Sequence, residues 1–61
     1  MGAKIRQYRE QLGMSQRQLA FALGLDPSAV CLWESGKSVP TVQNLYRLAD
    51  ILGCDARDLL D

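Results

Sequence analysis

Apolar residues recur every three or four positions along this chain, which is the spacing of one face of an α-helix. Ile5, Tyr8 and Leu12 share such a face, together with the charged Arg9, and predict a helix over about residues 3–12 that ends at Gly13. Alternating β-branched runs and Asn-Gly turns, the usual signals of strands and hairpins, do not occur in the sequence. The pattern therefore predicts an all-α fold.

Capping residues and glycines delimit the next two helices. Ser15 and Gln18 have the form of a capping box, which predicts the start of a second helix that closes at Gly24. Its inner face carries Leu19, Ala20 and Leu23. A third helix is expected to begin at Asp26-Pro27 and to end at Gly36, because an aspartate cap followed by proline suits a first helical turn. Its inward residues are expected to be Val30, Trp33 and Ala29.

Two further helices complete the chain. Thr41 is expected to cap a fourth helix that runs through Leu52 and stops at Gly53. Asp55 is expected to cap a last short turn. The fourth helix carries Leu45, Leu48, Ala49 and Leu52 at helical spacing, and the last turn carries Leu59 and Leu60.

The second and third helices are short and are joined by only three residues, Gly24-Leu25-Asp26. Two short helices connected in this way cross steeply, which is the geometry of a helix-turn-helix unit. We expect this unit to cover about residues 15–35, with the third helix projecting from the domain.

The composition limits the class of protein. With 61 residues, 48% of them hydrophobic, we expect one domain over residues 1–61 with one small core. No apolar run approaches a membrane span, and no signal peptide is visible, so we expect a cytoplasmic protein without a membrane partner. Cys31 and Cys54 are therefore expected to be free thiols.

The residue types argue against metal binding and against catalysis. The chain has no histidine, and two cysteines are too few for a cysteine-only metal site, so no metal or other cofactor is expected. No serine or cysteine has an obvious base beside it, so we expect no enzyme activity.

Charge is unevenly distributed although the formal net charge is zero. Through Arg47, six basic residues face three acidic ones, a balance of +3, and the remainder has one basic and four acidic residues, a balance of −3. A basic half with an acidic tail fits a domain that turns one face toward an anion, and ordinary solvated charge explains it equally well.

Taken together in this order and spacing, a set of residues resembles the Cro/cI-type (Xre) helix-turn-helix family over positions 5–60. The matching positions are Ser15-Gln16, Leu19-Ala20, Gly24-Leu25, Val30, Trp33-Glu34, Gly36, Pro40, Leu45, Leu48-Ala49, Leu52-Gly53 and Asp58-Leu59-Leu60. The resemblance implies a five-helix, lambda-repressor-like domain and a sequence-specific transcriptional regulator. In such a regulator the recognition helix, about residues 27–35, lies in the major groove of double-stranded DNA.

The resemblance also implies roles for individual residues. Gln16 corresponds to a glutamine that contacts phosphate and braces the helices, and Arg9 with Glu34 corresponds to an internal ion pair. Gln16 and Arg17 stand at a capped helix N-terminus, which favours a phosphate independently of the resemblance. The remaining expected phosphate contacts are in the loop after the third helix, and the expected outward positions are on that helix: Ser35, Lys37 and Ser38, then Pro27, Ser28, Ala29, Cys31 and Leu32.

The outward face of the third helix is poor in base-reading side chains. It carries no Arg, Lys, Asn or Gln, and serine, leucine and alanine discriminate weakly between base pairs. Specificity would then rest on apolar contact, water and DNA shape. Alternatively, Ala29, Cys31 and Leu32 form a docking face for a protein partner.

A homodimer is expected on DNA, because one domain of this kind contacts too few base pairs to select one site. The expected dimer surface is the loop after the third helix with the C-terminal end, including Val39, Pro40, Leu60 and the last helix.

Overall fold

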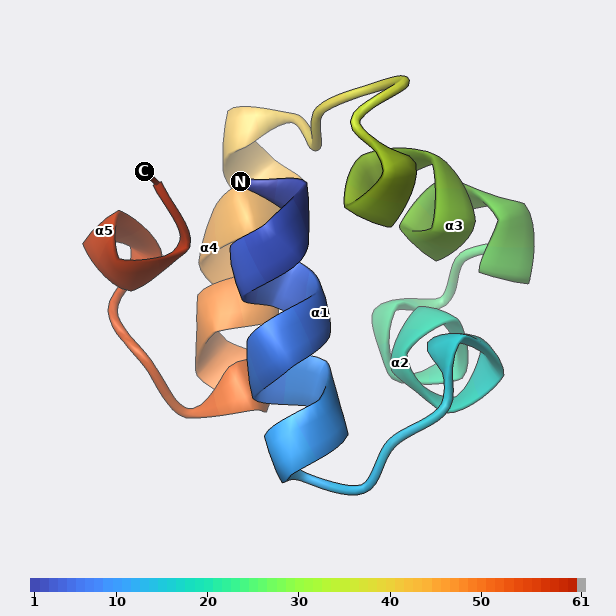
Figure 1. Cartoon of the computed structure of the whole chain (residues 1–61), viewed down its shortest axis with the longest axis horizontal. Helices are drawn as coiled ribbons and strands as arrows, with labels where there is room; N and C mark the ends of the chain where they lie inside the picture. The colour runs from blue at the N-terminus through green and yellow to red at the C-terminus, as the bar shows by residue number, and fades with distance from the viewer. Residues whose placement is uncertain (61) are drawn as a thin grey trace.

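The computed structural model describes residues 1–60 and shows five helices with no strand among them (Figure 1). The helices are α1 (Gly2–Gln11), α2 (Gln16–Leu23), α3 (Pro27–Ser35), α4 (Val42–Leu52) and α5 (Ala56–Leu59). The all-α prediction is therefore confirmed, and each helix begins within a residue of its expected start. None of these helices is both long and apolar enough to cross a bilayer.

The predicted caps explain where the helices begin. Ser15 Oγ accepts from the backbone N–H of Gln18 at 3.0 Å, and Gln18 Oε1 accepts from the backbone N–H of Ser15 at 2.8 Å. Asp26 Oδ1 accepts from the backbone N–H of Ser28 at 2.9 Å, so α3 also begins at its capping residue. Between them, Gly24 has a φ of 71°, the left-handed conformation that only glycine adopts without strain, and the chain turns sharply there.

All five helices contribute to one core. Each supplies a residue that is fully buried, so removing any one helix would open that core; these residues are Ile5, Leu19, Val30, Leu48 and Leu59. Leu12, which shares the predicted face of the first helix, and Leu60 are not part of it. Leu12 lies beyond the end of α1 and is 53% exposed, and Leu60 follows α5 and is 47% exposed. Helical spacing does not keep Leu12 on the inner face because α1 ends at Gln11, whereas an exposed Leu60 agrees with its place in the expected dimer surface.

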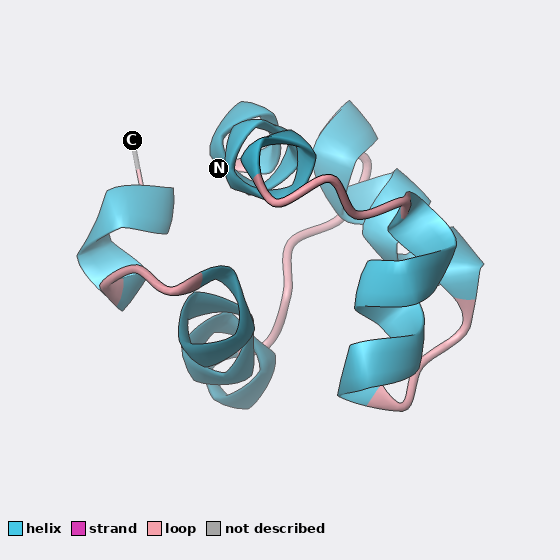
Figure 2. Ribbon diagram, turned by 90° about the horizontal axis from the view of Figure 1, so that it is seen from below, coloured by secondary structure: helices cyan, strands magenta, loops and turns pink. Residues whose placement is uncertain are grey.

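The helices are arranged around α1 (Figure 1). α2 and α3 pack against each other on one side of α1, while α4 runs beside α1 and α5 covers the opposite side. Figure 2, seen from below, shows the same separation between the α2–α3 pair and α5. The helix-turn-helix unit therefore forms one side of the molecule, and the acidic end of the chain forms the other.

Two close backbone contacts help to fix the α2–α3 pair to the remaining helices. A Cβ atom added to Gly2, in the first turn of α1, would collide with the backbone carbonyl oxygen of Trp33, so the start of α1 fits closely against the end of α3. Arg47 of α4 donates through Nη2 to the backbone carbonyl of Leu23 at 2.8 Å, where α2 ends. Neither contact was predicted from the sequence.

Candidate nucleic-acid interface

The recognition helix α3 has one buried and one exposed face. Val30 and Trp33 are buried, whereas Ser28, Cys31 and Leu32 are exposed. Leu32 keeps 42% of its surface exposed, a large value for a leucine in a helix that packs against two others. The exposed face of α3 thus combines a serine, a cysteine and a leucine.

The other two expected outward residues of α3 are less accessible. Ala29 is half-buried and packs against the core, as its helical spacing predicts, and Pro27 is half-buried in the first turn. The outward face is therefore narrower than the resemblance implied.

Exposed cations lie on α2 and in the loop directly after α3. Arg17 is exposed in the first turn of α2, and Lys37 is exposed directly after Gly36 closes α3. The backbone N–H and then the hydroxyl of Ser28 lower the pKa of Asp26, the α3 capping residue, and the positive charge of Arg17 lowers it further. The first turn of α2, which carries Arg17, contacts α3 through the hydrogen bond from Gln16 to Glu34. A helix with its side chains is about 10–12 Å in diameter, so α3 fits a DNA major groove about 12 Å wide.

The loop after α3 is held by one carbonyl group. The backbone oxygen of Leu32 accepts from the N–H groups of Lys37 and Ser38, at 3.0 and 3.3 Å, and from Oγ of Ser35 at 3.1 Å. The backbone around Lys37 is therefore fixed while its side chain is exposed to solvent. The Ser35 hydroxyl already donates within the helix, so only its oxygen lone pairs are available to another group.

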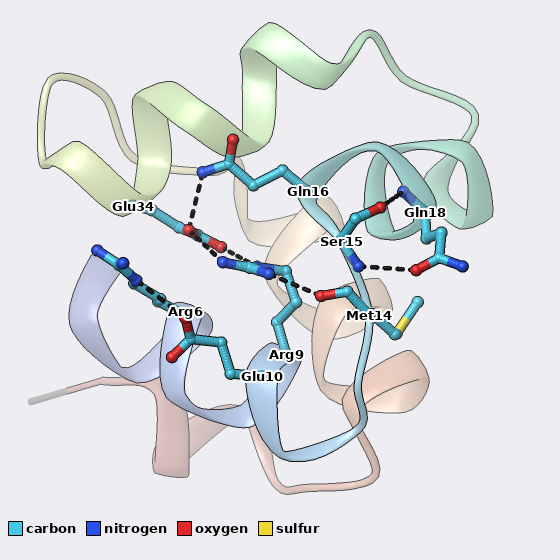
Figure 3. A network of polar contacts seen from close by, with 8 residues as sticks. All are labelled: Arg6, Arg9, Glu10, Met14, Ser15, Gln16, Gln18 and Glu34. Carbon is cyan, nitrogen blue, oxygen red and sulfur yellow. Dashed lines mark hydrogen bonds and ion pairs between the residues drawn. The ribbon is translucent and has the colours of Figure 1, made fainter.

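A buried ion pair joins α1 to α3 (Figure 3). Arg9 Nε lies 2.6 Å from Glu34 Oε2, and Arg9 Nη2 lies 3.0 Å from Glu34 Oε1, so the guanidinium meets the carboxylate with two parallel hydrogen bonds. The two side chains are only 10% and 4% exposed. Arg9 Nη1 also donates to the backbone carbonyl of Met14 at 2.7 Å, in the turn between α1 and α2. The ion pair expected from the resemblance is present.

Both members of this pair are charged. Burial acts to raise the pKa of Glu34, but the hydrogen bonds from Arg9 and Gln16 and the charges of Arg9 and Arg6 outweigh it, so the net pKa is lowered. The hydrogen bond to Glu34 raises the pKa of Arg9 against the opposing effect of burial. The carboxylate therefore accepts hydrogen bonds as an anion at neutral pH.

Gln16 joins the same network. Its Nε2 donates to Glu34 Oε1 at 3.0 Å, and its side chain is half-buried at the first position of α2. In Figure 3 the amide nitrogen points toward Glu34 and the amide oxygen points away from it. The sequence suggested a bracing glutamine and an ion pair separately, whereas the structure shows one network that connects three helices. Sequence spacing alone could not reveal it, since Gln16 and Glu34 are 18 positions apart.

Several large apolar side chains are exposed outside α3. Phe21 on α2 is 84% exposed, and Val39, Val42 and Tyr46 are 71%, 70% and 63% exposed in the loop before α4 and on its outer face. Val42 and Tyr46 are four positions apart, so they are neighbours on that face. The four-residue spacing of Val42 and Tyr46 in the sequence is the signal that could have identified this face.

The described residues contain no group of three or more His, Cys, Asp or Glu that could hold a metal ion, and they enclose no pocket. Cys31 is exposed and Cys54 is half-buried, and neither forms a disulfide. What the α2–α3 side offers a ligand is an exposed surface with two helix N-termini and two cations. That geometry suits a long polyanion better than a small molecule.

A helix-turn-helix family model matches residues 5–59, nearly the whole chain. The chain belongs to the Cro/cI-type helix-turn-helix family. Among curated proteins, this helix-turn-helix chain is 43% identical over 54 residues to the HTH-type transcriptional regulator DicA of Escherichia coli. The match covers 88% of this chain but only 40% of DicA, so the chain spans less than half the length of that relative.

Solved structures agree with the assignment. The helix-turn-helix chain matches the restriction-modification controller protein C.AhdI of Aeromonas hydrophila with a TM-score of 0.89 and 37% identity, over 97% of this chain and 89% of the other. It matches SinR, a master regulator of biofilm formation solved in complex with DNA, with a TM-score of 0.90 and 30% identity, over 98% and 100% of the chains. The same fold also forms 34% of the chain of an iron-containing protein, HppE, with a TM-score of 0.87 and 34% identity over 95% of this chain.

Proposed function

We propose that this helix-turn-helix domain is a sequence-specific DNA-binding regulator of transcription, with α3 in the major groove. The observation that carries the proposal is the exposed face of α3, with exposed cations on the neighbouring helix, Arg17, and directly after its end, Lys37. Cations beside such a helix can each meet a phosphate while the helix itself faces the base edges. The DNA-bound relative SinR supports this reading.

The N-terminus of α2 supplies a further phosphate site. The first N–H groups of a helix lack acceptors within it, and the helix dipole favours an anion there. Gln16 and Arg17 occupy this turn. Asp50 belongs to α4, and Asp55 and Asp58 belong to the segment around α5, which lies on the side of α1 away from α2 and α3 (Figure 1). The neutral net charge of the chain therefore does not oppose a local contact with DNA.

Base discrimination would come mainly from apolar contact and from DNA shape. Leu32 can touch a thymine methyl group, and Ser28 can hydrogen-bond to either kind of base pair. The hydroxyl of Ser28 also helps to lower the pKa of Asp26, the residue that caps α3. A contact with a base would therefore weaken the contact of this hydroxyl with Asp26. Each position then discriminates weakly, and deformability of the site becomes important.

Two copies on one site would double these weak contacts. The surface proposed for the second copy is the loop before α4 with the C-terminal end, and Val39 and Leu60 are exposed there while Pro40 is half-buried. Val42 and Tyr46 extend the apolar surface of that loop along α4. A two-fold pair of α3 helices would read half-sites about 34 Å apart. Sedimentation with a selected duplex tests this, because one chain per duplex at saturation on a non-palindromic site would contradict it.

Selection of bound duplexes from random DNA tests the function itself. We expect a preferred sequence to emerge and its affinity to fall steeply with salt. In Lys37→Ala the slope of log affinity against log salt should become shallower by about 0.9 for each bound chain, about 1.8 for a dimer, with sequence preference unchanged. Arg6→Ala removes an exposed cation from α1, outside the proposed DNA and dimer surfaces, and should leave the slope as it is.

One result of the same experiment would favour a different function. If no duplex is enriched and binding to cell proteins is insensitive to salt, Cys31 and Leu32 form a protein-docking face instead of a DNA-reading face. The half-buried Ala29 reduces the apolar area of that face, which is why we place DNA first.

A further inference from the structure

Gln16 is attached to α3 as well as to α2. Its side-chain Nε2 lies 3.0 Å from Glu34 Oε1, and that carboxylate is held from the other side by two hydrogen bonds from Arg9. Glu34 is 4% exposed, so solvent cannot replace these partners easily. The Gln16 side chain is therefore fixed before any ligand arrives.

The charge of Glu34 also determines which end of the Gln16 amide faces it. An ionised carboxylate can only accept hydrogen bonds, so the amide must turn its nitrogen toward Glu34 and its oxygen away, as Figure 3 shows. The nitrogen carries two hydrogens, and Glu34 takes only one. The second N–H remains as a donor at the start of α2, where the backbone N–H groups and the helix dipole also favour an anion.

We infer that Glu34 is a positioning residue for DNA binding, which fixes the Gln16 amide so that its second N–H is ready to donate to a DNA phosphate. The inference rests on the DNA-binding function proposed above. A free glutamine would lose side-chain entropy on binding, and half of its flip states would present oxygen to the phosphate. Glu34 removes both costs without touching DNA itself.

The charge of Glu34 and its role as a positioning residue predict opposite effects on DNA binding when Glu34 is replaced, and this makes the inference testable. A buried carboxylate near the interface repels phosphate, so replacing it with a neutral group should strengthen binding and steepen its salt dependence. If Glu34 acts through Gln16, the neutral and nearly isosteric Glu34→Gln should weaken binding, because a carboxamide can donate as well as accept and no longer fixes the amide of Gln16.

The experiment measures affinity for the selected duplex in wild type, Glu34→Gln, Gln16→Ala and the double variant, at a temperature where circular dichroism shows all four folded. We expect each single variant to bind about three- to tenfold more weakly, the size of fixing one side chain beforehand, with an unchanged salt slope. The double variant should bind no more weakly than Gln16→Ala. Additive losses, or tighter binding by Glu34→Gln, would overturn the inference.

A measurement on the wild-type protein covers the case in which Glu34→Gln does not fold. The side-chain amide of Gln16 should give two well-separated, slowly exchanging proton resonances, unlike the exposed Gln7 and Gln11 on α1, and the pair should shift when the duplex binds. Gln16 amide resonances that match those of Gln7 and Gln11 and that do not shift when the duplex is added would refute the inference. Failure of the proposed function is distinct, because wild type would then select no duplex at all.

Discussion

Replacing Arg9 with methionine should destabilise the fold strongly. Arg9→Met keeps much of the apolar stem but removes both hydrogen bonds to Glu34 and the one to the Met14 carbonyl. Glu34 would remain 4% exposed, and only Gln16 would still donate to it. Removing one partner of a buried ion pair costs about 3–5 kcal/mol, because a charge is left without compensation.

That loss is large for a chain of this size. Stability of roughly 0.05–0.15 kcal/mol per residue gives about 3–9 kcal/mol for 61 residues, so Arg9→Met should lose between a third and all of it. Glu34→Gln should lose less stability, since Arg9 keeps its hydrogen bond to the Met14 carbonyl. The long side chain of Arg9 can also reach solvent more easily than a buried carboxylate can.

Urea unfolding followed by circular dichroism measures these differences. Arg6→Met is a matched control on the same helix, because the Arg6–Glu10 pair is 64% and 56% exposed and should contribute less than about 1 kcal/mol. Combining Arg9→Met with Glu34→Leu should recover much of the lost stability by removing the stranded charge. An equal, small effect of Arg6→Met and Arg9→Met would refute the reasoning.

Three further predictions concern other parts of the fold. Gly2→Ala should lower stability by about 1–3 kcal/mol in thermal unfolding despite the better helix propensity of alanine, because the new methyl group meets the Trp33 backbone; unchanged stability would show that the start of α1 can move. Folding lowers the pKa of Glu34, so the contribution of this carboxylate to stability is complete above its ordinary pKa of 4.5 and is lost as pH falls through the lowered pKa. The melting temperature of wild type should therefore drop in acid, and that of Glu34→Gln should drop less. Cys31→Ser should bind DNA like wild type under reducing conditions, and peroxide should not change wild-type binding; abolition of binding by peroxide in wild type alone would reveal a redox switch at Cys31.

The fold was predictable because its boundaries are encoded locally. Ser15, Asp26 and Thr41 cap their helices through contacts two or three residues away, and Gly24 ends α2 by its own conformation. Such contacts depend on neighbours in sequence and can be inferred from spacing alone. Leu12 shows the limit, because α1 ends at Gln11 and the predicted face of that helix ends with it.

The candidate site was predictable only in part. Helical spacing identified the exposed face of α3, and the resemblance supplied the Arg9–Glu34 pair. Neither could show that Gln16 donates to the same carboxylate, or that Arg47 closes α2, because these contacts join residues 18 and 24 positions apart. Long-range polar contacts follow from how helices pack, and the local sequence pattern does not determine that packing.

The internal use of positive charge has a consequence for how such a protein would search a genome. Four of the seven Lys and Arg residues form hydrogen bonds inside residues 1–60, and only two of the others lie beside α3; the four are Arg6, Arg9, Arg47 and Arg57. Non-specific affinity grows with the number of phosphates neutralised, and Arg17 and Lys37 would neutralise about four per dimer. We therefore expect short residence on random DNA and little sliding, so that the domain finds its site mainly by repeated encounters from solution.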